Sequence, residues 1–380
     1  MILNNDPTNK YMNLKDFKTA KERREFLEKE LKIKLENVSN AHVDDEKTIH
    51  CENLVGATTL PLGVAGPLQI DKQSYYLPLA TTEGALVASV NRGCKAINLS
   101  GGAVTCLENV GTTRGPVFET TGIKESNEFK TWLDDNFKLL KSEAEKTSSY
   151  LKLKKIGTRI VGTYVYVRFY FDTTDAMGMN MVTIASHAVA QLIEQKKKVK
   201  CLAVSGNFCI DKKPAWLNFI SGRGKKVWAE VTLKKEVVEQ VLKSTPEKFF
   251  DVWLAKCMIG SAMAGSLGFN AHFANIVAAF FSATGQDLAH VVEGSMGITT
   301  SKVTKSGNLY VSVYMPSVMI GTVGGGTKLK TKQEALSIIG ARNSIELAEV
   351  LSGAVLAGEI SLLASLAEGT LSKTHEKLGR

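Results

Sequence analysis

The chain changes texture twice, and this division constrains its fold more than any other feature. Residues 52–115 and 205–367 are rich in Gly and Ala, whereas residues 116–203 carry charged helical patterns and aromatic, β-branched runs. Within the middle segment a helix is predicted over 125–146 and a strand over 157–171. This order is typical of an α+β sandwich rather than a Rossmann unit, and the sequence contains no G-x-G-x-x-G motif. We therefore expect an α+β fold in which a small unit is inserted into a larger domain.

The composition is that of a globular protein with more than one minimal core. The chain has 380 residues, of which 44% are hydrophobic and 22% charged, which argues against extended disorder. The cysteines form no C-x-x-C pair, which favours a reducing compartment and argues against a structural zinc site. They are Cys51, Cys94, Cys106, Cys201, Cys209 and Cys257. No metal is expected.

The formal charge of +9 does not indicate a nucleic-acid partner, because the lysines are scattered along the chain. We interpret the excess first as solvated lysine that favours solubility, and second as attraction for phosphate-bearing small molecules. Apolar runs are shorter than the roughly 18 residues that cross a membrane. Residues 351–367 are interrupted by Glu359, which indicates a buried helix, and the N-terminus shows no signal peptide. We expect a cytoplasmic protein with no membrane contact.

The remaining helical patterns complete the expected organisation. Helices are predicted over residues 14–36, 81–98, 256–283 and 332–367. The expected divisions are an N-terminal helical segment at 1–48, a large domain at 49–115 and 204–360, an inserted small domain at 116–203 and a C-terminal tail at 361–380.

Four short segments place ionisable side chains among small residues, where an unpaired charge is costly. They are 81–84, with Glu83; 205–214, with Asp211, Lys212 and Lys213; 285–287, with Asp287 after a helix that bears His272 and Asn275; and 373–375, with His375. Each segment also has a structural interpretation, such as a carboxylate that complements a helix dipole, a solvated turn or a core histidine. None of them establishes a function alone.

Two glycine segments indicate close approach of a ligand to the backbone. In 175–180 (DAMGMN) a carboxylate, a glycine and an amide lie at the start of a predicted helix, whose backbone N–H groups are free. In 320–327 (IGTVGGGT) three consecutive glycines cost backbone entropy that a structural turn does not require. A phosphate or a ribose is the interpretation we favour.

Together these segments resemble one family, 3-hydroxy-3-methylglutaryl-coenzyme A (HMG-CoA) reductase, in the catalytic domain of its class I, the eukaryotic and archaeal type. The matching blocks are ENLVGATTLPLGVAGPL (52–68), ATTEGALVASVNRGCKAI (80–97), TRGP (113–116), DAMGMNM (175–181), SGNFCIDKKPAWLNFISGRGK (205–225), GSAMAGSLGFNAHFANIVAA (260–279), GQD (285–287) and GTVGGGT (321–327). Arg168 also precedes Asp175 by seven residues, as in the family's signature. The blocks span most of the chain in the family's order.

The resemblance implies a fold and a reaction. The small inserted domain is expected to be ferredoxin-like and to bind the nicotinamide cofactor, while the large domain binds HMG-CoA. The family reduces (S)-HMG-CoA to (R)-mevalonate and CoA in a four-electron reaction of the mevalonate pathway, which leads to isoprenoids. Two NAD(P)H supply the hydrides. The resemblance further implies a homodimer or homotetramer with active sites at the subunit interface.

The same resemblance assigns four catalytic residues. Lys212 matches the lysine whose cation stabilises the oxygen that becomes anionic on hydride addition. Asp287 matches the aspartate that holds this lysine charged and oriented, and Glu83, expected near Asp287, matches the proton donor. His375 matches the C-terminal histidine that protonates the departing CoA thiolate.

Binding residues are carried over in the same way. Those for the HMG group are Arg114, Ser205, Asn207, Asp211, Lys213, Lys256, His272 and Asn275, and those for CoA phosphates are Asn91, Arg92 and Lys95. Those for the cofactor are Ser148, Asp175, Met177, Gly178, Met179, Asn180, Val323, Gly324, Gly325, Gly326 and Thr327. Some family members place an arginine near the 2′-phosphate of NADPH, and residues 147–150 contain none. Lys152 or Lys154 is the expected substitute, so the resemblance favours NADPH over NADH.

Two other functions are compatible with the sequence. One is a CoA-thioester oxidoreductase on the same scaffold with a different acyl group. The other is a non-catalytic CoA- or nucleotide-binding protein, which the joint presence of Glu83, Lys212, Asp287 and His375 disfavours because a binder needs no protonation roles.

Overall fold

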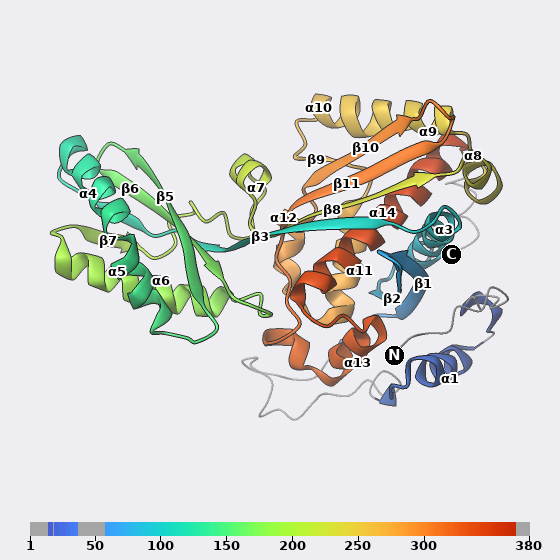
Figure 1. Ribbon diagram of the computed structural model, residues 1–380, viewed down its shortest axis with the longest axis horizontal. Helices are drawn as coiled ribbons and strands as arrows, with labels where there is room; N and C mark the ends of the chain where they lie inside the picture. The colour runs from blue at the N-terminus through green and yellow to red at the C-terminus, as the bar shows by residue number, and fades with distance from the viewer. Residues whose placement is uncertain (1–13, 18, 37–57, 370–380) are drawn as a thin grey trace.

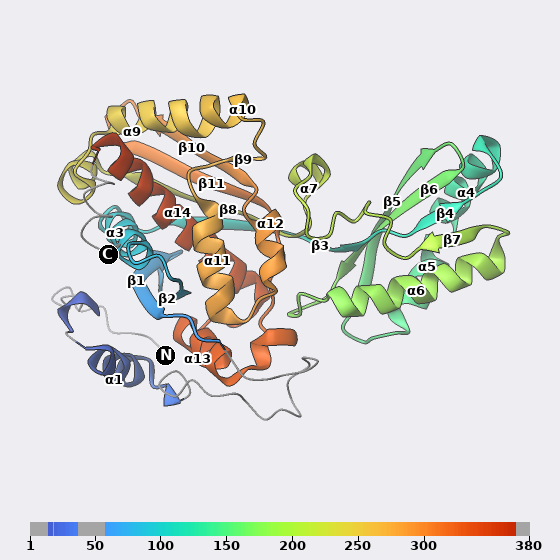
Figure 2. The same cartoon turned by 180° about the vertical axis from the view of Figure 1, so that it is seen from behind.

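The computed structural model describes residues 14–17, 19–36 and 58–369. The chain forms two lobes, with helix α7 between them (Figure 1). Figure 2 shows the same arrangement from behind, where α6 lies along the smaller lobe and α11 and α12 lie on the larger one. Mixed helices and strands in both lobes confirm the expected α+β class.

Strand β3 connects the two lobes. Its residues up to Gly111 pair with β8 in the larger lobe, and Thr112 to Arg114 pair with β6 in the smaller one. The nine-stranded sheet therefore runs through both lobes in the order β7-β4-β6-β3-β8-β11-β10-β9, with β5 on the far side of β6. Because the sheet is continuous, residues at the end of β3 lie where the lobes meet.

The smaller lobe packs its helices against its strands. Its elements are β4 (Val117–Glu119), α4 (Ile123–Asp135), α5 (Phe137–Glu145), β5 (Lys152–Val161), β6 (Tyr164–Asp172), α6 (Met179–Lys196) and β7 (Lys200–Ala203). A core separate from that of the larger lobe fills the space between them, and Phe118, Phe129, Phe171, Val182 and Ile193 are among its buried members.

The larger lobe contains the other elements, which bury the main core. They are η1 (Leu14–Asp16), α1 (Ala20–Leu31), β1 (Leu62–Ile70), β2 (Gln73–Ala80), α3 (Leu86–Leu99), β3 (Val104–Arg114), α7 (Trp216–Ser221), β8 (Gly224–Leu233), α8 (Lys235–Val237), η3 (Val238–Leu242), α9 (Pro246–Trp253), η4 (Leu254–Gly260), α10 (Ser261–Met263), β9 (Gly268–Phe269), α11 (Phe273–Thr284), η5 (Leu288–His290), α12 (Val291–Gly294), β10 (Gly297–Val303), β11 (Leu309–Val318), η6 (Gly325–Lys328), α13 (Lys330–Ile339) and α14 (Ser344–Ala367).

Helix α14 lies at the centre of the larger lobe. It is apolar on all sides, which is expected of a helix surrounded by protein, and it packs against α3, α9, α11 and the sheet. Among the described residues it alone is long and apolar enough to cross a membrane, but 83% of its most apolar stretch is buried within the molecule. It is therefore the core helix expected over residues 351–367.

Two long predicted helices are wrong in extent. The helix predicted over 332–367 is two helices, because Gly340 adopts φ 72° and ends α13, and Asn343 then caps α14. The helix predicted over 256–283 is also interrupted, since α10 ends before Gly265 and β9 precedes α11. Small residues made both patterns look continuous.

Four shorter predictions also need correction. The helix over 14–36 is reduced to α1, and the one over 125–146 is divided into α4 and α5 at Asn136. The helix over 81–98 begins only at Leu86, which leaves Glu83 in the preceding turn. The single strand over 157–171 is a hairpin of β5 and β6, with its turn at Gly162. Short turns have little apolar periodicity of their own, so the patterns of the elements on either side were merged into one predicted element.

The crossing of α3 and α14 generates a stability prediction. A Cβ atom added at Gly93 of α3 would lie 1.9 Å from the carbonyl oxygen of Ala357 in α14. Gly93→Ala must push the two helices apart, and we expect it to lower the free energy of unfolding by about 1–3 kcal/mol. Gly122→Ala is the control, because its Cβ would have no atom within 4 Å. Urea unfolding measures both; equal midpoints for the two variants would contradict the predicted clash.

Candidate active site

Lys212 and Asp287 form an ion pair where the lobes meet. The Lys212 Nζ–Asp287 Oδ2 distance is 2.8 Å, and both side chains are partly exposed. Burial raises the pKa of Asp287, but the hydrogen bonds from Lys212 and the Ala289 backbone, with the charges of His290 and Lys212, outweigh it and leave the pKa below its ordinary value. The sequence-based prediction that an aspartate orients this lysine therefore matches the geometry.

A buried charged network lies behind this pair and was missed by sequence reasoning. The Arg223 side chain is completely buried and donates to Asp211 at 2.9 Å and to Glu293. Glu293 Oε1 also accepts from the Lys212 backbone N–H at 3.1 Å, which fixes the loop that carries the lysine. Arg223 lies within a matched family block, but nothing in its local sequence indicated its burial.

Three of these groups have the composition of a metal site. Ligand atoms of Asp211, His290 and Glu293 lie within 4.8 Å of one another. However, Arg223 donates to both carboxylates of the group. A guanidinium already neutralises these anions, so the donor set fits an ion-pair network better than a divalent cation.

Glu83 belongs to a second cluster, with Asn275 and His272. Asn275 Nδ2 donates to Glu83 Oε2 at 2.9 Å, and it lies 3.5 Å from His272 Nδ1. The buried Glu359 of α14 accepts from the backbone N–H groups of Ala271 and His272, which holds this end of α11 in place. The sequence had indicated Glu359 only as an interruption of an apolar run.

The two clusters lie at opposite ends of α11. Asn275 is in its first turn, and Asp287 follows its last residue, Thr284. A 12-residue helix is about 18 Å long, so Glu83 does not approach Asp287 within one chain. The expected proximity of Glu83 to Asp287 is therefore not met inside a single subunit.

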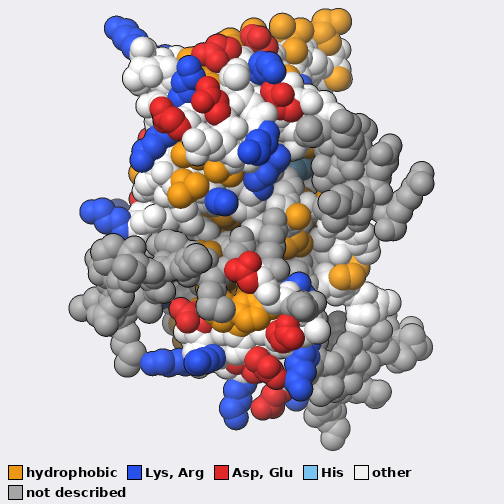
Figure 3. Space-filling model, turned by 90° about the vertical axis from the view of Figure 1, so that its right-hand side faces the viewer, with side chains coloured by type: hydrophobic (Ala, Val, Ile, Leu, Met, Phe, Trp, Pro, Cys, Tyr) orange, Lys and Arg blue, Asp and Glu red, His pale blue; other side chains and the backbone are white. Residues whose placement is uncertain are grey.

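A cavity of about 730 Å³ adjoins the Glu83 cluster. Asn91, Arg92 and Lys95, expected to hold CoA phosphates, line it together with Glu83. Arg92 is tied to Ser361 and Ser365 of α14, and its burial lowers its pKa. Lys95 is exposed, whereas Asn91 accepts from the Gly66 backbone. On the side of the larger lobe that lies to the right in Figure 1, acidic and basic side chains are interspersed rather than gathered into one basic patch (Figure 3).

The two glycine segments lie side by side, although about 140 residues separate them. Ala176 and Val323 form a parallel β-bridge, and the Thr322 backbone donates to Asp175. A Cβ atom at Gly321 would lie 2.5 Å from the Met177 backbone nitrogen, so only glycine allows this approach. This contact thus brings together the residues of both segments that were predicted to bind the cofactor.

The glycine loop is also held against the residues that precede Asp287. Gln286 donates to the carbonyl of Gly321 and accepts from its N–H, both at 2.9 Å. A Cβ atom on Gly285 would lie 2.4 Å from the Gly326 carbonyl oxygen. The two glycine segments therefore lie directly beside the Lys212–Asp287 pair.

Other predicted residues occupy three places. Arg114 is paired with Asp211 at 3.7 Å and donates to Thr183. The loop that carries Lys212 also contains Ser205, Asn207 and Lys213, whose side chains are on its exposed side. Lys256 lines a separate cavity of about 680 Å³ that also reaches His272.

The remaining predicted cofactor residues lie around α6 and β5. Gly178 caps α6, Met179 and Asn180 begin it, and Ser148 lies in the turn before β5. Lys154 donates to the Asn109 carbonyl, whereas the Lys152 side chain is exposed. His375 lies outside the described residues.

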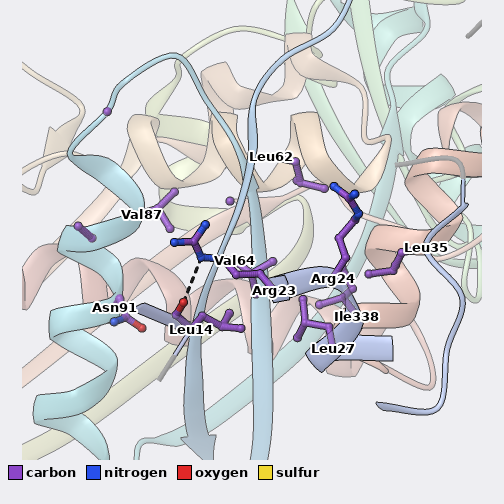
Figure 4. Close-up of a pocket in the computed structure, with 13 residues that line it drawn as sticks. Leu14, Arg23, Arg24, Leu27, Leu35, Leu62, Val64, Val87, Asn91 and Ile338 are labelled. Carbon is purple, nitrogen blue, oxygen red and sulfur yellow. Dashed lines mark hydrogen bonds between the residues drawn. The ribbon is translucent and has the colours of Figure 1, made fainter. Parts of the chain in front are cut away.

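A smaller cavity of about 360 Å³ was not indicated by the sequence (Figure 4). Apolar side chains from α1, β1 and α13 line it, with Arg23 anchored on the Leu14 carbonyl oxygen. It shares Asn91 with the larger cavity.

The lowered pKa of Asp287 generates a pH prediction. A carboxylate whose folded pKa is depressed stabilises the fold above its unfolded pKa, and this contribution is lost as pH falls. Asp287→Asn should therefore have a lower Tm than the unmodified chain at pH 7, and the gap should narrow below about pH 4. Exposed Asp135→Asn is the control. A gap that stays constant from pH 7 to pH 3.5 would show that the carboxylate charge is not the cause.

Comparisons with known proteins agree on one family. A family model described as hydroxymethylglutaryl-coenzyme A reductase matches residues 19–380. The 3-hydroxy-3-methylglutaryl-coenzyme A reductase of Methanothermobacter thermautotrophicus is 50% identical over 94% of this chain and 92% of its own length. Reductase 1 of Dictyostelium discoideum is 44% identical over 94% of this chain and 68% of its own length.

A solved structure supports the fold. The class II reductase of Streptococcus pneumoniae, bound to NADPH in open conformations, has a TM-score of 0.78 and 18% identity, and the match covers 93% of this chain and 98% of that one. The family model and the two sequence relatives go further. They confirm the family that the sequence blocks indicated, and the chain belongs to the HMG-CoA reductase family.

Proposed function

We propose that this protein reduces (S)-HMG-CoA to (R)-mevalonate and CoA, as a step of the mevalonate pathway to isoprenoids. The observation that carries the proposal is the Lys212–Asp287 ion pair beside the joined segments 175–180 and 321–327. A fixed cation next to a cradle of backbone groups suits hydride addition to a carbonyl. Family membership supplies the substrate class.

The residues have complementary roles in this reaction. Two molecules of NADPH or NADH, bound in turn against residues 175–180 and 321–327, would supply the two hydrides of this four-electron reduction. Lys212 presents its ammonium to the carbonyl oxygen, which is more negative in the transition state than in the ground state. Asp287 holds the ammonium in position, and Glu83 donates a proton to the product oxygen. His375 protonates the CoA thiolate, and Arg114 and Lys213 bind the HMG carboxylate.

We further propose NADPH as the preferred cofactor and class I as the class. The exposed Lys152 supports a 2′-phosphate partner. Identities of 50% and 44% to an archaeal and a eukaryotic relative, against 18% to a class II enzyme, support class I.

The domain division follows the same proposal. Residues 116–203 form the NAD(P)-binding domain, and 49–115 with 204–360 form the HMG-CoA-binding domain. Residues 1–48 are the N-terminal helical segment, and the enzyme is cytoplasmic. The tail expected over 361–380 is shorter, because residues up to Ala367 belong to the core helix α14. The separate hydrophobic core of the smaller lobe supports its assignment as a domain.

The active site is composite, built from two subunits of a homodimer or homotetramer. Glu83 of one chain meets Lys212 and Asp287 of another, because α11 keeps them apart in a single chain. Exposed apolar side chains at Leu288 and Ile220, 54% and 74% exposed, support the burial of this face by a second copy.

Removal of the ammonium tests the proposed function. Lys212→Met should lower kcat with HMG-CoA by at least about 10²–10³-fold, because the anionic oxygen loses its cation. Cofactor oxidation at 340 nm measures turnover, and quenching of protein fluorescence should show that NADPH still binds. Lys305→Ala, in an exposed turn, is the control. Turnover retained in Lys212→Met would remove this lysine from the mechanism, and an inactive unmodified chain would refute the function itself.

Subunit mixing tests the composite site. Glu83→Gln and Lys212→Met proteins, each inactive, are dissociated and reassociated in equal amounts. Half of the random dimers are then mixed, each with one intact site, so about a quarter of the original activity should return. A mixture of Lys212→Met with Asp287→Asn is the control. It should stay inactive because both changes affect the same half-site. No recovery in the first mixture would place each site within one chain.

A further inference from the structure

His290 is completely buried behind the Lys212–Asp287 pair and is not among the residues that the family resemblance assigns. It ends η5, the short helical turn that Asp287 caps. Its two ring nitrogens face different carboxylates. Nδ1 lies 3.0 Å from Glu293 Oε1, whereas Nε2 lies 3.7 Å from Asp287 Oδ2 and 3.8 Å from Asp211 Oδ1.

The contact with Glu293 determines where the first proton is. Glu293 Oε1 also accepts from Arg223 and from the Lys212 backbone, so it is an ionised acceptor. The Nδ1 atom, at hydrogen-bond distance from an acceptor, must therefore carry a proton.

The second nitrogen is left without a partner. Nε2 is buried and makes no hydrogen bond with any described residue. In the neutral ring its lone pair would face the carboxylates of Asp211 and Asp287, which also accept. A proton on Nε2 turns this repulsion into attraction.

We propose that His290 is a positioning residue of the reaction, protonated on Nε2, whose positive charge behind Asp287 shares that carboxylate with Lys212. Asp287 Oδ2 then lies between two cations, and it holds the Lys212 ammonium without neutralising it alone. When His290 loses this proton, Asp287 pairs with Lys212 more strongly, and the ammonium stabilises the substrate oxygen less. The rate of reduction should fall as pH rises.

Three other charged side chains lie near the His290 ring or near its carboxylate neighbours. Arg223 Nη1 lies 3.5 Å from Nδ1 and opposes protonation, but it is itself paired with Asp211 and Glu293. Arg114 contacts Asp211 at 3.7 Å. Lys212 acts through Asp287 and is partly exposed. The carboxylates of Asp211, Asp287 and Glu293 thus surround the imidazole ring of His290 and these three cations.

The first test uses kinetics and rests on the proposed function. His290→Gln keeps a polar side chain at this buried position but cannot titrate. Its kcat should fall about tenfold at the optimal pH of the unmodified enzyme, with KM for HMG-CoA changed less than twofold. The alkaline decline of kcat should also disappear. Exposed His187→Gln is the control and should keep the unmodified profile. A His290→Gln profile parallel to that of the unmodified enzyme would overturn the proposal.

The second test uses the unmodified protein, so it does not depend on whether a variant folds. The unmodified protein has six histidines, which are labelled with ¹⁵N and observed by NMR. One ring should show both nitrogens protonated at pH 6.5, with N–H protons that exchange slowly, and this signal should be lost over the pH range in which kcat declines. Absence of any buried imidazolium would overturn the proposal, whereas an imidazolium in an enzyme inactive toward HMG-CoA would overturn only the proposed substrate.

Discussion

The fully buried guanidinium of Arg223 is the interaction on which the site depends. It lies directly before β8 and donates to Thr113 of β3, to Asp211 of the loop that carries Lys212, and to Glu293 of α12. A buried charge that loses one partner costs about 3–5 kcal/mol. The strand, the loop and the helix must therefore assemble around it together. The position of Lys212 follows, because its backbone shares the Glu293 carboxylate with Arg223.

Close backbone contacts between the two glycine segments complete this arrangement. Gly321 lies close to the Met177 backbone, and the side-chain amide of Gln286 hydrogen-bonds both the carbonyl and the N–H of Gly321. A side chain at Gly321 would separate the segments that are proposed to hold the cofactor. Fixed backbone groups need no reorganisation during the reaction, which is why such a cradle suits a charge that develops in the transition state.

Helix α11 is the reason for proposing that the catalytic groups come from two subunits. Its first turn holds Asn275 against Glu83, and Asp287 follows its end. The helix is stiff and its N-terminus is fixed by Glu359, so no local movement joins the two ends. On this proposal the separation makes association a condition of activity, since each site takes its proton donor from one subunit and its cation from the other.

The fold class and the family of this protein could be predicted from local patterns along the sequence. The α+β class, the change of texture at the inserted unit and the family blocks all followed from residue order, because periodicity and glycine positions record backbone preferences of neighbouring residues. The pairing of Lys212 with Asp287 was also expected, but only through the family resemblance, whereas the contact between 175–180 and 321–327 was not predicted and is seen only in the structure.

Only the tertiary structure decided the rest. It divided the merged helices, placed Arg223, His290 and Glu293 in one buried network, and put Glu83 far from Asp287 within the chain. These features depend on contacts between distant parts of the sequence, where a charge is tolerated only if the fold supplies its partner. A lone arginine or histidine has the same local pattern whether solvent or two carboxylates surround it.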